Sequence, residues 1–595
     1  MIEVKEKISK RLQEVAKELG ITAESVIVQE PEDTVHGDLT SNIAMQISKE
    51  LKSNPMDIAN RIVEKFPKDE DIEKIEVVKP GFINFFLSEK YLLAMLDDIN
   101  LKKEEYFKLN IREGKKYIIE YTDPNPFKTF HIGHLYTNMV GESFARLVEA
   151  LGASVIRANY QGDVGLHVAK TIWGLLKMLD DDGITFGDLE GKSLVDRVRY
   201  LGDAYMLGFN MYDDQKDESV INEVKDFNYY IFSLYITSLP KKEFFTRFEE
   251  KNIKDIYFKS REWCLEYFER IYERTGTKFD KYYFESEMGE SGLNIVGENI
   301  GGKGKNIFKE SEGSVIYEGD EKKGLHTRVF INSEGLPTYE AKEIALAFKK
   351  FGDFSFDESV VITANEQSSY FRVVFDALSQ LSSEIASKSL HFSHGMVKLP
   401  GAEKMSSRKG KIIEGEWLLD ETQKRVEEMM RSNEKWSEED ILKVSDTIAV
   451  AAIKYSFIKV SVGKDVIFDF EKATSFDGDT GPYLQYVYAR CNSILTEASS
   501  RENKISEVVL DPHTKELLRV IGKYRGVLLS SAVNYSPSTL CSYLFDLGQT
   551  FNAFYQNVRV LDSENREFLL KVVEATAHTM KHGLNILGIK VVEKM

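Results

Sequence analysis

Two histidines separated by two residues are the first side chains that could do chemistry. They end the segment Asp-Pro-Asn-Pro-Phe-Lys-Thr-Phe-His-Ile-Gly-His, residues 123–134. A helix beginning near His131 brings His131 and His134 close together, and Gly133 lets a ligand approach the backbone. The free N–H groups of a helix start favour a triphosphate, and imidazole N–H groups can donate to phosphoryl oxygens as charge builds. The alternatives are a pair of surface histidines or a metal site, although no third ligand lies nearby in the sequence.

A second group of reactive side chains follows Pro400-Gly401 as a basic loop. Its members are Lys404, Met405, Ser406, Ser407, Arg408 and Lys409, followed by Gly410. Three cations and two hydroxyls in seven residues suit a polyphosphate leaving group. A solvated basic loop is the alternative interpretation. The two groups lie about 270 residues apart, with an interrupted sheet pattern between them.

A parallel sheet is predicted to position the histidines. Residues 117–121 and 155–159 have the composition of buried strands, and the first is followed by a proline-rich turn and a helical segment. Strand, turn, helix and strand begin a doubly wound fold, which binds nucleotides at its first turn. We interpret residues 171–325 as an insertion whose Phe and Tyr side chains form a helical core. The sheet is expected to resume at 314–317, 327–332 and 360–363.

The rest of the chain predicts two further domains. Residues 1–20 have the period of an amphipathic helix, a second helical stretch covers 39–51, and 83–87 is strand-like. The charged run 102–113 is interpreted as a linker. From 476 onward the pattern is helical. The predicted fold class is α/β: a Rossmann-type doubly wound parallel catalytic domain (113–475) with an insertion, a small N-terminal α/β domain (1–100) and an all-helical C-terminal domain (476–595).

Composition limits the class of protein. The 595 residues are 42% hydrophobic with a net charge of −18, and the three cysteines are too few for a disulfide framework or a thiolate metal cage. The acidic sum disfavours nucleic acid as a partner, but residues 481–595 carry 13 basic and 11 acidic side chains, so charge alone does not decide. No apolar run approaches the roughly 18 residues of a membrane helix, and the N-terminus does not resemble a signal peptide. We expect a cytoplasmic protein.

The two motifs together resemble the signature of class I aminoacyl-tRNA synthetases, and their surroundings resemble arginyl-tRNA synthetases. The matching blocks span nearly the whole chain except the insertion: His36-Gly37-Asp38 with Pro80 to Asn84, Asn125 to His134 with Asn159 to Asp163, Gly481 to Tyr486 with Ala489-Arg490, and Leu587-Gly588-Ile589. In that family a lysine just upstream of the histidines replaces the second lysine of the basic loop. Here Lys128 occupies the upstream position, and Ser407 stands where the loop lysine would be.

The resemblance also implies a substrate pocket. The family binds arginine with Glu120, Asn125, His131 and Gln367, and with a tyrosine–acid pair four residues apart, here Tyr339 and Glu343. Without the other motifs, that pair is an ordinary surface helix pair. The family commonly has Asp at the second position, so Glu343 is a methylene longer. In the C-terminal domain, Tyr483, Tyr488 and Arg490 are expected to contact tRNA, and packing in a helical core is the alternative for the tyrosines.

The resemblance implies ATP-dependent ligation of L-arginine to the 3′ end of tRNA(Arg) through an arginyl-adenylate. ATP enters with Mg²⁺, and we expect no protein-bound structural metal and a monomer. Dependence of arginine activation on bound tRNA is a further expectation. Two alternatives remain: a class I synthetase for another amino acid such as lysine, and an inactive synthetase-like protein that binds RNA or acts as a scaffold. Dispersed cysteines disfavour a cysteine-specific enzyme.

Overall fold

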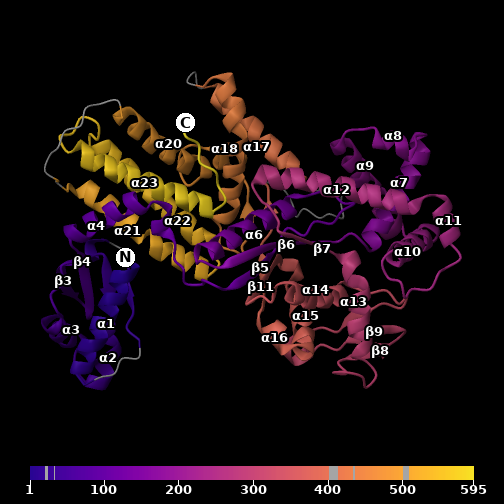
Figure 1. The fold of residues 1–595 in the computed structure, drawn as a ribbon, viewed down its shortest axis with the longest axis horizontal. Coiled ribbons are helices and arrows are strands. Elements are labelled where there is room, and N and C mark those ends of the chain that lie inside the picture. The colour runs from indigo at the N-terminus through magenta and orange to yellow at the C-terminus, as the bar shows by residue number, and fades with distance from the viewer. Residues whose placement is uncertain (21–24, 32–33, 401–412, 433–435, 500–507, 509) are drawn as a thin grey trace. The chain divides into compact units, whose positions relative to one another are not determined.

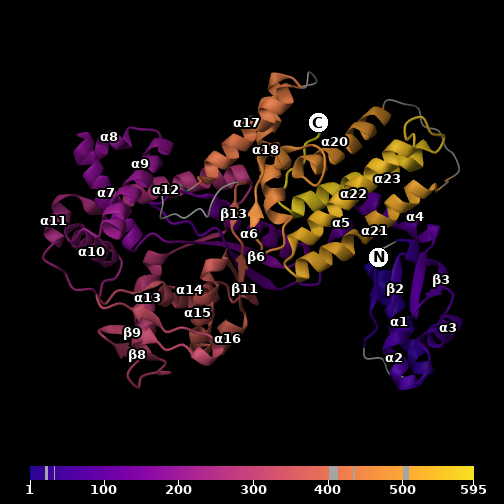
Figure 2. The same ribbon diagram turned by 180° about the vertical axis from the view of Figure 1, so that it is seen from behind.

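The chain forms two compact units in a computed structural model, shown from two sides in Figures 1 and 2. The structure describes residues 1–20, 25–31, 34–400, 413–432, 436–499, 508 and 510–595. One unit joins residues 1–109 to most of 476–595, and the other comprises 110–475 with 587–589.

The N-terminal part of the first unit is an antiparallel sheet covered by helices. Its strand order is β1-β2-β4-β3, and Ile8, Leu12 and Phe85 are fully buried in its core. The predicted helix 1–20 and strand 83–87 are present as α1 and β4, whereas the predicted helix 39–51 divides into β2 and α2. The elements are α1 (Ile2–Glu18), β1 (Val28–Gln29), η1 (Thr34–His36), β2 (Leu39–Ser41), α2 (Ile43–Leu51), α3 (Pro55–Lys65), β3 (Ile72–Val78), β4 (Phe82–Leu87), α4 (Glu89–Lys102) and α5 (Glu104–Phe107).

The C-terminal part of this unit is helical, drawn in orange to yellow in Figures 1 and 2. Its helices are α20 (Gly481–Ala498), α21 (Pro512–Val533), α22 (Pro537–Asn557) and α23 (Arg566–Ile586). Proline at the first turn starts three of them, and Asp511 caps α21 by accepting the N–H groups of His513 and Thr514.

A parallel sheet organises the second unit. Its order in the described residues is β12-β11-β5-β6-β7, with every neighbouring pair parallel. The strands are β5 (Lys116–Glu120), β6 (Ser154–Gln161), β7 (Lys281–Phe284), β11 (Glu358–Ala364) and β12 (Ser389–His394). The chain moves outward from β5 in one direction and then returns to β11 on its other side. The carboxyl ends of β5 and β11 are therefore the switch point at which doubly wound sheets bind ligands.

Helices cover this sheet and extend from it. They are α6 (Ile132–Ala150), α7 (Leu166–Asp182), α8 (Phe186–Glu190), α9 (Leu194–Phe209) with the π-helical turn η2 (Asn210–Asp214), α10 (Glu218–Ser233), α11 (Phe245–Glu250), α12 (Ile253–Thr275), α13 (Glu285–Glu298), α14 (Tyr339–Phe354), η4 (Asn365–Gln367), α15 (Ser368–Leu381), α16 (Ser383–Ser387), α17 (Gly415–Arg431), α18 (Glu438–Ile458) and α19 (Phe470–Thr474). A short pair, β13 (Val397–Lys398) and β14 (Val466–Ile467), lies beyond β12.

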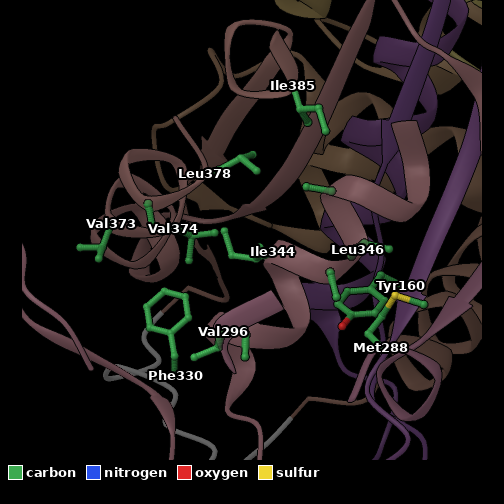
Figure 3. Packing of buried hydrophobic residues seen from close by; sticks show 14 of the residues in the cluster. Tyr160, Met288, Val296, Phe330, Ile344, Leu346, Val373, Val374, Leu378 and Ile385 are labelled. Carbon is green, nitrogen blue, oxygen red and sulfur yellow. The ribbon is translucent and has the colours of Figure 1, made fainter. Parts of the chain in front are cut away.

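One apolar cluster holds α13, α14 and α15 against strands β5 and β6 of the sheet. Figure 3 shows Ile344 of α14 facing Val374 and Leu378 of α15, with Tyr160 and Met288 in the same cluster. Ile344 and Leu378 are fully buried. This packing fixes α14, the helix that carries the predicted tyrosine–acid pair.

Two of the predicted strand assignments are wrong. Residues 314–317 and 327–332 do not resume the parallel sheet: β9 (Ser314–Tyr317) and β10 (Arg328–Ile331) pair antiparallel with each other, and β8 (Phe308–Ser311) completes this separate sheet. Conversely, β7 lies inside the predicted insertion yet is the edge strand of the parallel sheet. Short apolar runs of equal period do not reveal which sheet they join.

Candidate active site

A cavity of about 570 Å³ opens at the carboxyl ends of β5 and β11. It collects side chains from both halves of the sheet. The predicted residues that line it are Glu120, Asn125, Lys128, His131, Gly133, His134, Tyr339, Glu343 and Gln367. A smaller cavity of about 270 Å³ shares Asn125, Lys128 and both histidines and is bounded on its far side by α9.

The segment between β5 and α6 has an unusual backbone that presents Asn125 and Lys128. Thr122, Asp123 and Phe127 all have positive φ angles (78°, 42° and 68°), a conformation that costs a non-glycine residue about 1–2 kcal/mol. Buried contacts offset this cost: Asp123 Oδ1 accepts the N–H of Tyr160 at 2.7 Å, and the Phe127 ring is fully buried. Backbone strain of this kind is concentrated at functional sites.

His131 and His134 cap helix α6 reciprocally. His131 Nδ1 accepts the N–H groups of Gly133 (3.1 Å) and His134 (3.4 Å), while His134 Nδ1 accepts the His131 N–H (3.4 Å). The two rings stack with centroids 3.7 Å apart. A Cβ on Gly133 would lie 2.9 Å from the His131 ring, so this position has to be glycine.

Both histidines are neutral in this setting. Burial lowers the pKa of His131 to about 4 and lowers that of His134 well below its usual value, with the Lys128 charge acting in the same direction. Because Nδ1 accepts backbone hydrogen bonds in both rings, the single ring proton is on Nε2. Each imidazole therefore offers an Nε2–H donor.

Lys128 supplies the positive charge next to these donors. Among the described residues its ammonium has no ion pair. Burial, with a smaller contribution from Lys170, lowers its pKa to about 8. Lys128 lines both cavities.

Lys404, Met405, Ser406, Ser407, Arg408 and Lys409 lie outside the described residues. The residues that follow this segment are nevertheless attached to the histidine motif: the Ile132 N–H donates to Ile413 O at 2.9 Å, and the Gly415 N–H donates to Phe130 O at 2.8 Å. Before this segment in the chain, His394 at the end of β12 lines the cavity. Its Nε2 atom lies 2.7 Å from Thr137 Oγ1 of α6.

Three buried glutamates, Glu120, Glu285 and Glu343, line the cavity, and two buried lysines pair with two of them. Lys350 Nζ lies 2.8 Å from Glu120 Oε2, and both side chains are almost fully buried. Lys342 forms a buried ion pair with Glu285, the first residue of α13. Glu343 is 8% exposed and has no hydrogen bond or ion pair among the described residues. If all five side chains are ionised, these three glutamates and two lysines carry a net charge of −1.

Carboxyl groups at the cavity have raised pKa values. Burial, followed by the negative charge of Glu120, raises the pKa of Asp123 well above its usual value. Desolvation, followed by the negative charge of Glu120, raises the pKa of Glu343 to about 8, although Lys350 partly opposes this. Tyr339, four residues earlier on the same helix face, is half exposed at the cavity. A cation that enters the cavity would meet a carboxyl group without a partner.

Sequence reasoning missed Glu285, Lys342 and Lys350. Lys350 follows Glu343 by seven residues, two helical turns, so its place on the same face was a usable signal. Glu285 gave no such signal, because it was assigned to the insertion and comes to the cavity only through the pairing of β7 with β6.

The predicted tRNA-binding residues lie in the helical part of the first unit. Tyr483 and Tyr488 are each 6% exposed; Asn552 Nδ2 donates to Tyr483 Oη at 2.9 Å, and Tyr488 Oη donates to the Glu593 carboxylate. Both tyrosines thus make packing contacts. The Arg490 guanidinium stacks on the rings of Tyr486 and Tyr555. A contact of these residues with tRNA remains a prediction.

Comparison with known proteins agrees with this geometry. Residues 95–470 match the family described as tRNA synthetases class I (R), catalytic domain; residues 3–87 match the arginyl tRNA synthetase N terminal domain, and 484–595 match the DALR anticodon binding domain. The chain is 30% identical to an arginine–tRNA ligase of Treponema denticola (97% of this chain, 96% of that protein) and 29% identical to one of Flavobacterium psychrophilum (97% of each).

Solved structures show the same fold. The Thermus thermophilus arginyl-tRNA synthetase aligns with a TM-score of 0.77 at 22% identity (99% of this chain, 100% of that one), and the Plasmodium falciparum enzyme with 0.77 at 21% (100% and 99%). The parallel sheet with a histidine pair at its switch point thus defines a class I tRNA synthetase. Within that class, the chain belongs to the arginyl-tRNA synthetase family. The predicted family and fold class are confirmed. None of the helices among the described residues has the length and apolarity to cross a membrane.

Proposed function

We propose that this chain joins L-arginine to the 3′ end of tRNA(Arg) at the expense of ATP, releasing AMP and pyrophosphate. The observation that carries the proposal is the meeting, in one cavity, of a buried carboxyl group and an ammonium, neither with an ion pair among the described residues, and two neutral imidazole donors. The first feature suits a cationic amino acid, and the others suit a phosphate that gathers negative charge.

In the first step, a carboxylate oxygen of arginine attacks the α-phosphorus of ATP. A bond forms between that oxygen and phosphorus while the bond to the bridging β-phosphate oxygen breaks, and pyrophosphate leaves. The Nε2–H groups of His131 and His134 and the ammonium of Lys128 are placed to stabilise the added charge on the phosphoryl oxygens. Lys404 to Lys409 would act on the leaving pyrophosphate, since the chain that follows them is hydrogen-bonded to the histidine motif.

In the second step, the 2′-hydroxyl of the terminal ribose attacks the arginyl carbonyl, and AMP leaves. No covalent bond to the enzyme is needed in either step. Mg²⁺ would enter with ATP as part of the substrate complex, held by phosphate oxygens and water. In the part of the chain that the structure describes, no three His, Cys, Asp or Glu side chains are grouped to hold a metal ion.

Arginine recognition is assigned to Glu120, Asn125, His131, Tyr339, Glu343 and Gln367, to which the geometry adds Glu285. A guanidinium presents N–H groups in a planar fork that pairs with carboxylates. Glu343 and Glu285 come from different helices and line the same cavity. A Cβ on Gly162 would lie 2.2 Å from Asn125 Oδ1, so Gly162 leaves the space that Asn125 needs beside them.

We further propose three functional domains: residues 1–100 contacting the outer corner of the tRNA, 113–475 performing catalysis, and 476–595 binding the anticodon through residues that include Tyr483, Tyr488 and Arg490. We expect a cytoplasmic monomer. An inactive scaffold would not need an unpaired buried carboxyl group beside unpaired phosphate-binding groups, because both are costly to bury.

The test is ATP–pyrophosphate exchange with each amino acid, with and without tRNA, followed by aminoacylation of tRNA(Arg). Exchange only with arginine, and transfer to tRNA(Arg), is the expected result. Exchange with lysine at a comparable rate would contradict the assignment of arginine as the substrate. Absence of exchange with every amino acid in the presence of tRNA would favour an inactive, synthetase-like scaffold protein.

A further inference from the structure

The aromatic side chains of α9 and η2 contact two lysines, the half-buried Lys128 and the buried Lys170. The Lys128 ammonium lies 5.1 Å from the centre of the Tyr205 ring. The Lys170 ammonium lies 4.3 Å from the ring of Tyr212 and 5.5 Å from that of Phe209. These rings belong to the segment that the sequence assigned to a helical core without chemistry. Tyr205 instead borders the smaller cavity, together with Lys128 and both histidines.

Close packing holds α9 against the catalytic motif. A Cβ on Gly202 would lie 2.9 Å from Thr129 Oγ1, next to Lys128, and a Cβ on Gly208 would lie 2.2 Å from Lys170 O of α7. At such distances the helix cannot shift away without losing its contacts. The Tyr205 ring is therefore held in place relative to Lys128.

A ring and a carboxylate stabilise a buried ammonium differently. A carboxylate would neutralise Lys128 and compete with phosphate for it, whereas an aromatic face attracts the ammonium and leaves its charge free. Lys170 has both kinds of partner, because it pairs with the Asp213 carboxylate in addition to its ring contacts. Lys128 has the ring contact and, among the described residues, no ion pair.

We propose that Tyr205 is a positioning residue that holds the Lys128 ammonium charged, oriented and available beside the phosphate site. The inference rests on the role proposed above for Lys128 and gives the predicted insertion a part in adenylate formation. Tyr205 itself need not touch the nucleotide.

Lys170 of α7, Glu285 of α13 and Asp213 of η2 act on the pKa of Lys128. The other titratable or charged groups near Lys128 are the neutral His131, His134 and His167, and the smaller cavity adds Arg199 and Asp203 of α9 and Glu414. Burial lowers the pKa of Lys128 to about 8, so the charged fraction changes steeply near neutral pH. Loss of the ring contact lowers this pKa further, because it removes an attraction that only the charged form experiences.

The experiment compares the pH dependence of kcat/KM for ATP in Tyr205→Leu, Tyr205→Phe and wild-type protein at saturating arginine and tRNA, because kcat/KM reports the titration of the site before ATP binds. In Tyr205→Leu the fall of kcat/KM at alkaline pH is expected to move downward by about half to one pH unit. Tyr205→Phe keeps the ring and is expected to follow the wild type. Tyr200→Leu is the matched control: Tyr200 lies on the same helix with Lys192 5.5 Å from its ring, but it lines neither cavity.

An unshifted profile in Tyr205→Leu, even with a lower kcat, would overturn the inference, as would an equal shift in Tyr200→Leu. Tyr205→Met supplies a second variant without a ring if the leucine variant does not fold. In a Lys128→Arg background the guanidinium stays charged, so Tyr205→Leu should no longer move the profile; a persistent shift there counts against Tyr205 acting through Lys128. An active wild type with these adverse results leaves the proposed function intact, whereas an inactive wild type refutes that function.

Discussion

Lys350 Nζ and Glu120 Oε2 form an ion pair of 2.8 Å whose side chains are only 4% and 2% exposed. The pair joins the last residue of β5 to the fourth turn of α14, so it ties the first strand of the parallel sheet to the helix that carries Glu343. Lys350 also provides a positive charge that opposes the rise in the pKa of Glu343. Lys350 therefore stabilises the negative charge of two carboxyl groups of the proposed arginine pocket, Glu120 and Glu343.

Removal of this lysine should destabilise the protein. In Lys350→Met, Glu120 becomes a buried charge without a partner, which costs about 3–5 kcal/mol of unfolding free energy. Denaturant unfolding measures the loss. Lys349→Met is the control, because Lys349 is half exposed in its pair with Asp353, and such surface pairs contribute about 0–1 kcal/mol. Adding Glu120→Gln to Lys350→Met should recover part of the stability; a double variant no more stable than the single one would contradict this explanation.

The groups that could be predicted from the sequence are those whose chemistry is local. His131, His134 and Lys128 lie within seven residues, and their helix-start pattern predicts a phosphate site from the local sequence. Glu285 has no such local signal, because it comes to the cavity through the pairing of β7 with β6. The spacing of Lys350 from Glu343 indicates a shared helix face but does not reveal the ion pair of Lys350 with Glu120. Tertiary structure alone brings these charges to Glu120 and Glu343.

The elements of the fold also differ in how well the local sequence predicts them. The strands β5 and β6, the start of α6 at its N-cap His131 and the helical C-terminal region agree with the sequence patterns. The strands β9 and β10 were wrongly assigned to the parallel sheet, since a run such as Ser314–Tyr317 has the same apolar character in either sheet. The choice of partner strand depends on contacts far apart in the chain.

Gly133 offers a test of the reciprocal histidine cap. In Gly133→Ala the new Cβ would come within 2.9 Å of His131 Cε1 and Nδ1 and displace the ring. Since one misplaced transition-state donor costs about 10²–10³ in kcat, we expect a loss of kcat of that order. The measurement is steady-state aminoacylation. Gly297→Ala in α13, where a Cβ meets nothing within 4 Å, is the control. Wild-type kcat in Gly133→Ala would show that the His131 ring position is not needed.

The role of Lys128 as the phosphate-binding cation is tested by Lys128→Ala. The variant keeps the pocket carboxyl groups but loses the ammonium beside the histidines, so kcat should fall by about 10²–10³ while the KM for arginine stays close to that of the wild type. ATP–pyrophosphate exchange in the presence of tRNA measures the step directly. Lys128→Arg retains a charge and should recover part of the rate. Full activity in the alanine variant would remove Lys128 from the mechanism.

Glu343 predicts that arginine binding depends on pH with a definite sign. Its pKa is raised to about 8 in the empty cavity, mainly because burial penalises the ionised form. Below that pH the carboxyl is protonated, and a guanidinium binds well only after the proton leaves. The apparent affinity for arginine should therefore rise by up to about tenfold per pH unit as the pH increases toward 8, and level off above it. Calorimetry in two buffers of different ionisation enthalpy should detect up to one proton released per arginine bound near pH 7.

The Glu343→Gln variant cannot release this proton. Its affinity for arginine should therefore be about 10²-fold lower at pH 8 and nearly independent of pH between 6 and 8. Glu343→Asp retains a titrating group and should keep the slope. If Glu343→Gln shows the same pH dependence as the wild type, the proton comes from another group, and Glu343 is not the unpaired carboxyl that accepts the guanidinium.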